Sequence, residues 1–191
     1  QPEDWEGVTM ENGRVVKLSL DEFDLTGAVP AEIGRLSALK VLWLHYNQLT
    51  SLPAEIGQLT SLEQLYLGGN KLTSLPAEIW QLTSLRELFL RGNQLTSLPA
   101  EIGRLTSLMQ LDLRDNQLTS VPAEIGQLIL LTYLNLGGNR LTSLPAVIGQ
   151  LTALERLILN RNQLTSVPAA IREFIAAGCQ VFLDPGMTFD E

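Results

Sequence analysis

The sequence predicts an α/β solenoid, with a curved parallel sheet on its concave side and short helices or 3₁₀ turns on its convex side. Asparagine and proline each recur every 23 residues over most of the chain. Leucine supplies 39 of the 191 residues, whereas aromatic residues make up only 6%. We expect a cap at each end, because a solenoid otherwise exposes the apolar cross-section of its terminal repeats.

Residues 1–14 are predicted to form the N-terminal cap. Trp5 is the only aromatic residue in this stretch, and we expect it to plug the open end of the core. The chain begins at Gln1 without a methionine, which we interpret as a fragment or a processed form.

Residues 15–168 are predicted to form seven repeats of the pattern LxxLxLxxNxLTSLPAEIGQLTS. The first repeat is divergent, with Phe23 at the asparagine position and one extra residue before Pro30. In each repeat an LxL segment, such as residues 42–44, alternates inward apolar and outward variable side chains, as a strand does. The apolar residues that follow are spaced three and four apart, which predicts a helical turn beginning at a proline such as Pro53.

The recurring asparagine is predicted to be structural rather than a binding site. A buried amide at each bend can bond the backbone of adjacent turns, whose polar groups would otherwise be unpaired. The predicted ladder consists of Asn47, Asn70, Asn93, Asn116, Asn139 and Asn162.

Residues 169–191 are predicted to form the C-terminal cap. The segment AAIREFIAAG predicts a helix that ends at Gly178, because glycine commonly terminates helices. The segment CQVFLD then predicts a last strand, and PGMTFDE a tail that folds over the end or frays.

The repeat pattern resembles the leucine-rich repeat family over nearly the whole chain. Its LPAEIGQL units are most similar to plant intracellular Ras-group proteins and related animal scaffolding proteins, which implies signalling or assembly. The string WEGVTMENGRVVKLSL resembles the N-terminal caps of plant extracellular repeat proteins. Those caps carry a cysteine pair, whereas Asp4 and Thr9 stand near the corresponding positions here. A cytoplasmic location is therefore expected.

Composition disfavours several classes of function. The chain has 21 acidic and 13 basic residues, a net charge of −8 and a pI of about 4.7, so we expect no nucleic-acid partner and no membrane partner. No run reaches the roughly 20 apolar residues of a membrane-spanning helix. A single cysteine, Cys179, and a single histidine, His45, leave no disulfide, thiolate cluster or multi-histidine metal site.

No catalytic residue, metal site or cofactor is predicted. Asp112 with Asp115 could suggest a cation site or an acid–base pair, but the sequence supplies no surrounding ligands and no nucleophile. The pairs Gly68–Gly69 and Gly137–Gly138 are interpreted as flat strand ends rather than a nucleotide-binding motif. We therefore expect a protein that is not an enzyme.

The outward strand positions differ between repeats, although the rest of each repeat is nearly copied. Structural needs are the same in every repeat, so this variation suggests a face tuned for binding, with drift at exposed sites as the alternative. Large aromatic residues on an open sheet favour binding of a protein or peptide. The predicted partner-binding residues are Trp43, His45, Tyr46, Tyr66, Phe89, Arg91, Asp112, Arg114, Tyr133, Asn135, Arg156 and Ile158.

Three other interpretations remain open for this face. His45 could tune binding through its titration near neutral pH, or it could be a plain contact. The aromatic residues could instead serve a glycan or small-ligand receptor. Near-identical repeats also fit a scaffold that has no specialised ligand.

The convex side carries a candidate second contact. Ile129 and Leu130 replace the usual Thr–Ser, Val147 replaces the usual glutamate, and Trp80 replaces a glycine. Such residues could support self-association, so a monomer or a weak homodimer is expected, with ordinary surface variation as the alternative.

A regular threonine column offers a remote alternative, ice binding, because such ladders resemble the ice-binding faces of some solenoids. Each threonine follows a buried leucine, so scaffold packing is the favoured interpretation. The column consists of Thr50, Thr73, Thr96, Thr119, Thr142 and Thr165.

Overall fold

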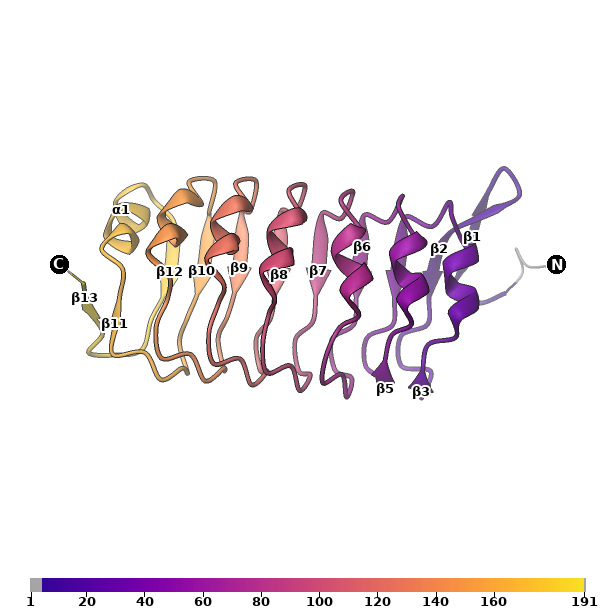
Figure 1. The fold of residues 1–191 in the computed structure, drawn as a ribbon, viewed down its shortest axis with the longest axis horizontal. Coiled ribbons are helices and arrows are strands. Elements are labelled where there is room, and N and C mark those ends of the chain that lie inside the picture. The colour runs from indigo at the N-terminus through magenta and orange to yellow at the C-terminus, as the bar shows by residue number, and fades with distance from the viewer. Residues whose placement is uncertain (1–4, 191) are drawn as a thin grey trace.

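The computed structural model describes residues 5–190, which wind into an α/β solenoid as predicted (Figure 1). One strand from each turn joins a single sheet in the order β1-β2-β4-β6-β7-β8-β9-β10-β12. β1 pairs with β2 antiparallel, and every later pairing in this sheet is parallel. The strands are β1 (Val8–Glu11), β2 (Arg14–Ser19), β4 (Val41–Trp43), β6 (Gln64–Tyr66), β7 (Glu87–Phe89), β8 (Gln110–Asp112), β9 (Tyr133–Asn135), β10 (Arg156–Ile158) and β12 (Gln180–Phe182).

The register of the sheet places equivalent residues of successive repeats side by side. Leu42 pairs with Leu65, and Leu65 pairs with Leu88, so the inward leucines form one column. All three are fully buried. The outward residues stand in matching columns on the opposite face, because successive residues of a strand point to opposite sides.

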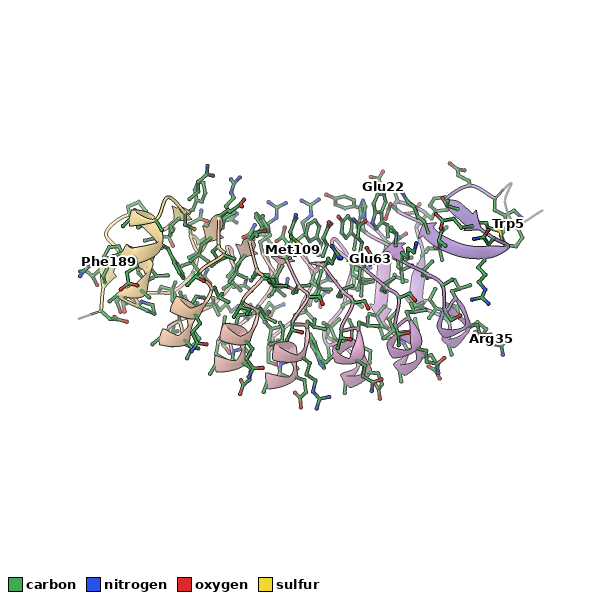
Figure 2. The ribbon with its side chains drawn as sticks, turned by 90° about the horizontal axis from the view of Figure 1, so that it is seen from above. Trp5, Glu22, Arg35, Glu63, Met109 and Phe189 are labelled. Carbon is green, nitrogen blue, oxygen red and sulfur yellow. The ribbon has the colours of Figure 1, made fainter. Side chains whose placement is uncertain are left out.

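The convex side consists of short helical turns, which spread along the outer edge of the arc in Figure 2. Within residues 5–190, six of these turns are 3₁₀ helices, at Ala31–Arg35, Ala54–Gln58, Ala77–Gln81, Ala100–Arg104, Ala123–Gln127 and Ala146–Gln150. Pro53 lies immediately before its helix with φ −77° and ψ 157°, so the prediction that it is the first helical residue is wrong by one position. Its carbonyl accepts the first helical hydrogen bond, from the Ile56 amide at 3.1 Å.

Two short parallel pairs lie outside the main sheet. β3 (Thr26–Ala28) pairs with β5 (Gln48–Ser51), and β11 (Ser166–Val167) pairs with β13 (Thr188–Phe189). The second pair brings the tail back against the last repeat. Between the two strands of this pair, α1 (Ala170–Ala176) is followed by Gly178 at φ +94°, a conformation that glycine adopts without a Cβ penalty.

The asparagine column forms a ladder of amides inside the bends. Asn93 donates from Nδ2 to the carbonyls of Leu67 and Leu90, both at 2.9 Å, and its Oδ1 accepts from the Leu72 amide at 3.0 Å. Asn70, Asn116 and Asn139 repeat this pattern in neighbouring turns. Each amide therefore joins two repeats through buried backbone groups, which need hydrogen-bond partners away from water.

The N-terminal end differs from the expected plugged cap. Trp5 is 65% exposed, so it does not fill the end of the core, and Asp4 lies outside the described residues. The β1–β2 hairpin extends the edge of the sheet instead. Behind it, Leu18, Leu20 and Leu25 are only half-buried and line an apolar hollow of about 500 Å³.

Within the described residues, no helix combines the length and the apolar character that crossing a membrane requires. The longest, α1, has seven residues. A membrane-spanning helix needs roughly 20.

Candidate binding face

Three aromatic rings stack across adjacent strands of the concave face. The centroids of Trp43 and Tyr66 lie 5.3 Å apart with an interplanar angle of 7°, and those of Tyr66 and Phe89 lie 4.5 Å apart at 10°. The parallel register pairs these residues directly on β4, β6 and β7. Lys17 Nζ lies 3.6 Å from the centroid of the Trp43 ring and continues the stack toward β2. Each ring is half-buried, because its neighbours cover its faces.

A carboxylate fixes the hydroxyl end of the central ring. The Tyr66 hydroxyl donates to Glu87, whose other oxygen accepts from Gln64 Nε2 at 3.2 Å. Burial, and then the hydrogen bond and charge of Glu87, raise the pKa of the Tyr66 phenol above its usual value. The phenol is therefore neutral at physiological pH and is held in one orientation on the sheet.

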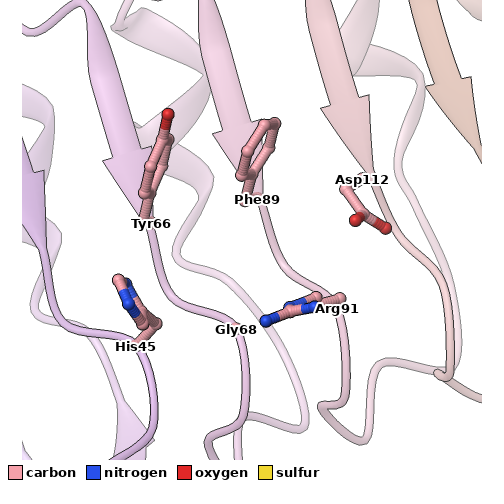
Figure 3. Close-up of a pocket in the computed structure, with 6 residues that line it drawn as sticks. All are labelled: His45, Tyr66, Gly68, Phe89, Arg91 and Asp112. Carbon is pink, nitrogen blue, oxygen red and sulfur yellow. The ribbon is translucent and has the colours of Figure 1, made fainter. Parts of the chain in front are cut away.

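A hollow of about 330 Å³ opens beside this stack (Figure 3). The rings of Tyr66 and Phe89 form its wall, and Arg91 extends across its floor toward His45. Residues at or just after the strands of four neighbouring repeats line this hollow. Its lining residues are His45, Tyr66, Gly68, Phe89, Arg91 and Asp112.

A hydrogen-bonded carboxylate holds His45 in place. His45 Nδ1 lies 2.8 Å from Asp21 Oδ1, and the same oxygen accepts from the His45 backbone amide at 3.0 Å. The Ser19 hydroxyl donates to the other oxygen at 2.9 Å. Sequence reasoning missed this contact, although Asp21 and His45 occupy one column of adjacent repeats.

Gly68 and Gly69 form a notch that lets two side chains meet. A Cβ on Gly68 would lie 2.8 Å from Arg91 Cγ, and a Cβ on Gly69 would lie 2.7 Å from Tyr46 Cδ1. Across this notch the Arg91 guanidinium donates to the Tyr46 hydroxyl, with its Cζ 5.2 Å from the ring centroid. The interpretation of this glycine pair as a merely flat strand end is therefore incomplete.

Two predicted contact residues are instead buried at the ends of strands β8 and β9. Asp112 is 6% exposed, and its Oδ1 accepts from the Arg114 backbone amide at 3.1 Å. Asn135 is 2% exposed and accepts from the Gly137 amide at 3.0 Å. In both cases a short side chain bonds the backbone amide two residues further along the chain. Asn135 is therefore too buried to be the partner contact that was predicted, and Asp112 remains only as part of the lining of the hollow.

The charge of Asp112 is partly matched by its neighbour. Arg114 Nε lies 3.6 Å from Asp112 Oδ2. Burial is nevertheless the largest influence, and it raises the pKa of the Asp112 carboxyl despite the hydrogen bond and charge of Arg114.

The remaining predicted contacts lie on β9 and β10, apart from the stack. The Tyr133 hydroxyl accepts from Asn135 Nδ2 at 3.0 Å, and the Arg156 guanidinium lies 4.9 Å from the centroid of the Phe182 ring. Tyr133 and Arg156 line a separate hollow of about 340 Å³. Ile158 is half-buried on the same strand as Arg156. The predicted set thus divides into two groups, with Arg114 between them.

The convex candidates differ in how far they are exposed. Ile129 and Leu130 are 58% and 51% exposed, but Trp80 is only 2% exposed, so its assignment to an outer contact is wrong. Trp80 is part of the hydrophobic core of the solenoid. Val147 is half-buried, and a Cβ added to Gly126 would lie 3.1 Å from the Cβ of Val147.

Other chemistry finds little support in residues 5–190. No group of three or more His, Cys, Asp or Glu side chains could hold a metal ion in this part of the chain. Burial raises the pKa of the Cys179 thiol, which disfavours a reactive thiolate. The six threonines of the column are all exposed, so they form a surface ladder rather than part of the core.

Family models match most of the chain. One described as a leucine-rich repeat region matches residues 11–115, and one described as a leucine rich repeat matches residues 106–164. The chain belongs to the leucine-rich repeat family. The repeat geometry described above is thus the form that this family takes in the present chain.

Several solved structures resemble this leucine-rich repeat protein. A leucine-rich repeat protein of Leptospira interrogans shares 44% identity over 88% of this chain and 42% of its own, with a TM-score of 0.79. The GASSHO1/SCHENGEN3 receptor-kinase ectodomain of Arabidopsis thaliana, in complex with CASPARIAN STRIP INTEGRITY FACTOR 2, shares 32% over 87% of this chain and 23% of its own, with a TM-score of 0.73. PEPR1, in a structure with AtPEP1, shares 28% over 99% of this chain and 27% of its own, with a TM-score of 0.84. This chain therefore spans less than half the length of each of these proteins.

Proposed function

We propose that this leucine-rich repeat protein is a non-enzymatic interaction module that binds a protein or peptide on its concave face. The observation that carries the proposal is the stack of Trp43, Tyr66 and Phe89 on an open sheet. Aromatic side chains are the usual anchors of protein interfaces, because they bury large areas at a low entropic cost. The stack is also pre-organised, since each ring is held by its neighbours, so little ordering remains to oppose binding.

The charge distribution supports a protein or peptide partner. The concave columns carry seven basic and seven acidic residues, which leaves the acidic excess of the chain on its other surfaces. A nearly neutral aromatic face within an acidic shell disfavours nucleic acid. Two of the similar structures, the Arabidopsis receptor ectodomain and PEPR1, are complexes with a named ligand, which fits the proposal for this chain.

We place this binding in intracellular signalling or assembly, in the cytoplasm. The support is the absence of the cap cysteines that plant extracellular repeat proteins carry, together with the LPAEIGQL form of the repeats. Expression of a fluorescent fusion of the full-length protein tests this location, and a secreted product would contradict it.

Affinity capture tests the binding face. Wild-type protein and the variant Trp43→Ala/Tyr66→Ala/Phe89→Ala are each incubated with lysate of the cells that make the protein. We expect a protein captured by the wild type to be lost from the variant, while the circular dichroism spectra of the two stay alike.

The convex variant Ile129→Thr/Leu130→Ser is the matched control, because it installs the residues that most other repeats carry at these positions. It should retain the captured protein. Loss of capture here, with retention by the aromatic variant, would favour self-association or docking through Ile129 and Leu130, which are the most exposed aliphatic residues of the described chain.

A further inference from the structure

We propose that the hollow beside Arg91 binds the carboxylate of an aspartate or glutamate side chain from an extended segment of the partner. This inference rests on the proposed function and specifies the chemistry of one anchor. The stack of Trp43, Tyr66 and Phe89 would receive apolar residues of the same segment, and Arg91 would receive the acidic one.

Arg91 is a cation that faces the hollow without a carboxylate partner. Within residues 5–190, ion pairs at 4.0 Å or less engage other cationic or titratable side chains of the concave face: Lys40, His45, Arg86, Arg114 and Arg161. Arg91 belongs to none of these pairs, and its one hydrogen bond to a side chain goes to the neutral hydroxyl of Tyr46. A guanidinium has five N–H donors in a planar fork, so most of them remain for a ligand.

The geometry presents this guanidinium to a ligand. Gly68 has no side chain to cover it, and Arg91 lies across that residue on the floor of the hollow in Figure 3. Tyr46 holds the other edge of the guanidinium from a left-handed backbone position, at φ 55°. The side chain is therefore oriented before binding, which favours the two-pronged pairing that carboxylates make with arginine.

The charges lining the hollow favour an anion. Asp112 is the only carboxylate that lines it among the described residues. It pairs with Arg114 at 3.6 Å, and the charge of Arg91 acts on it only from beyond ion-pair distance. Asp21 is likewise engaged by His45. Arg91 thus makes no direct ion pair with a carboxylate of the hollow. The rings of Tyr66 and Phe89 exclude water from one side, which strengthens a charged hydrogen bond.

The position of the hollow favours an internal side chain over a chain terminus. It lies near β6, β7 and β8, with further strands of the sheet on both sides. A segment lying along the solenoid can therefore continue past Arg91 in both directions. The ligand is expected to be an acidic residue within a sequence rather than its last residue.

Selection from a phage-displayed library of random 12-residue peptides tests the inference. We expect peptides selected on the wild type to share aspartate or glutamate at one aligned position next to aromatic or aliphatic residues. A synthetic selected peptide is then compared with its analogue in which that acid is replaced by the corresponding amide. The amide should bind wild type at least about tenfold more weakly, because hydrogen bonds to charged groups contribute about 1.5–3 kcal/mol.

Arg91 variants assign that loss to this residue. Arg91→Gln should bind the acidic peptide and its amide analogue equally, and Arg91→Lys should restore part of the difference. Arg86→Gln is the matched control, because Arg86 lies on the same repeat, paired with Glu63 at 4.0 Å, and does not line the hollow. It should behave as the wild type does.

The outcomes separate this inference from the proposed function. Selected peptides that need the aromatic stack but share no acidic position would overturn the inference alone. The same conclusion follows if the amide analogue loses as much affinity for Arg91→Gln as for wild type. A library that yields no binding peptide, or peptides that bind the triple aromatic variant equally well, would overturn both.

Discussion

At the scale of single residues, short polar side chains on the strands hydrogen-bond backbone amides, whereas the large aromatic side chains make up the concave binding face. The outward columns were predicted from the period of two along each strand, and the stack of Trp43, Tyr66 and Phe89 follows from it. The burial of Asp112 and Asn135 was not predictable from their outward position on the strands, because it depends on the length of the side chain. A short side chain can accept a hydrogen bond from the backbone amide two residues further along, whereas an aromatic ring cannot.

Replacement of Asn93 by alanine tests the amide ladder. We expect Asn93→Ala to lower the free energy of unfolding by about 1–3 kcal/mol, because it leaves the buried Leu72 amide unpaired. It also removes one of the two asparagine donors from each of the Leu67 and Leu90 carbonyls, which keep Asn70 and Asn116. Chemical denaturation measures this change. Gln94→Ala, at the exposed next position, is the control, and equal stabilities of the two variants would contradict the ladder.

Asp112→Asn tests the effect of burying a charge. The pKa of Asp112 is raised above the usual 3.8, so its stabilising contribution is complete below 3.8 and is lost as pH rises through the folded-state pKa. Asparagine keeps the acceptor for the Arg114 amide, as Asn135 does one repeat later. We therefore expect Asp112→Asn to unfold at higher denaturant concentration than wild type at pH 7.

The advantage of Asp112→Asn should shrink as the pH falls, because the carboxyl of the wild type then becomes neutral. Denaturation at a series of pH values measures this trend. A variant that is less stable than wild type at neutral pH would show that the pair with Arg114 outweighs the cost of burial.

At the scale of elements, each turn is placed by its close approach to the next. A Cβ on Gly57 would lie 2.7 Å from the Glu78 carbonyl oxygen, and one on Gly34 would lie 2.8 Å from Glu55 Cβ. In five of the six 3₁₀ helices of the described residues, a glycine before the last helical residue thus allows the turns to pack tightly. Trp80 stands where the other repeats have this glycine. Comparison of the repeats identified the substitution, but it could not tell whether the indole points into the core or outward.

Trp80→Ala tests the inward position of that indole. Trp80 is 2% exposed, so we expect its removal to lower the free energy of unfolding by about 3–5 kcal/mol through lost burial and a cavity. Thermal and chemical denaturation measure the change. Trp5→Ala is a control of the same residue type at 65% exposure, and its effect should stay within about 0.5 kcal/mol.

A small effect of Trp80→Ala, comparable with that of Trp5→Ala, would contradict the buried placement. The N-terminal cap was the least predictable element for a related reason. A terminal segment has no repeat with which to compare it, so nothing in the pattern showed that Trp5 would lie outside the core.

At the scale of the whole molecule, the recurring apolar positions determine the fold, whereas the outward strand positions of the concave face can vary without changing it. Period, leucine content and the LxL strands were enough to predict the order of sheet and turns, because each repeat must bury the same apolar positions against its neighbours. The contacts between Tyr46 and Arg91, two strands apart, were not predictable. They depend on two glycines in the intervening repeat, whose role appears only when three strands are aligned in space.

The affinity of the captured partner for matched variants tests the central claim most directly. Isothermal titration would compare wild type, Trp43→Ala/Tyr66→Ala/Phe89→Ala and Ile129→Thr/Leu130→Ser. We predict a dissociation constant at least about 100-fold weaker for the aromatic variant, because several anchors of an interface are lost together, and an unchanged constant for the convex variant. An aromatic variant that is folded and binds as tightly as wild type would contradict the account.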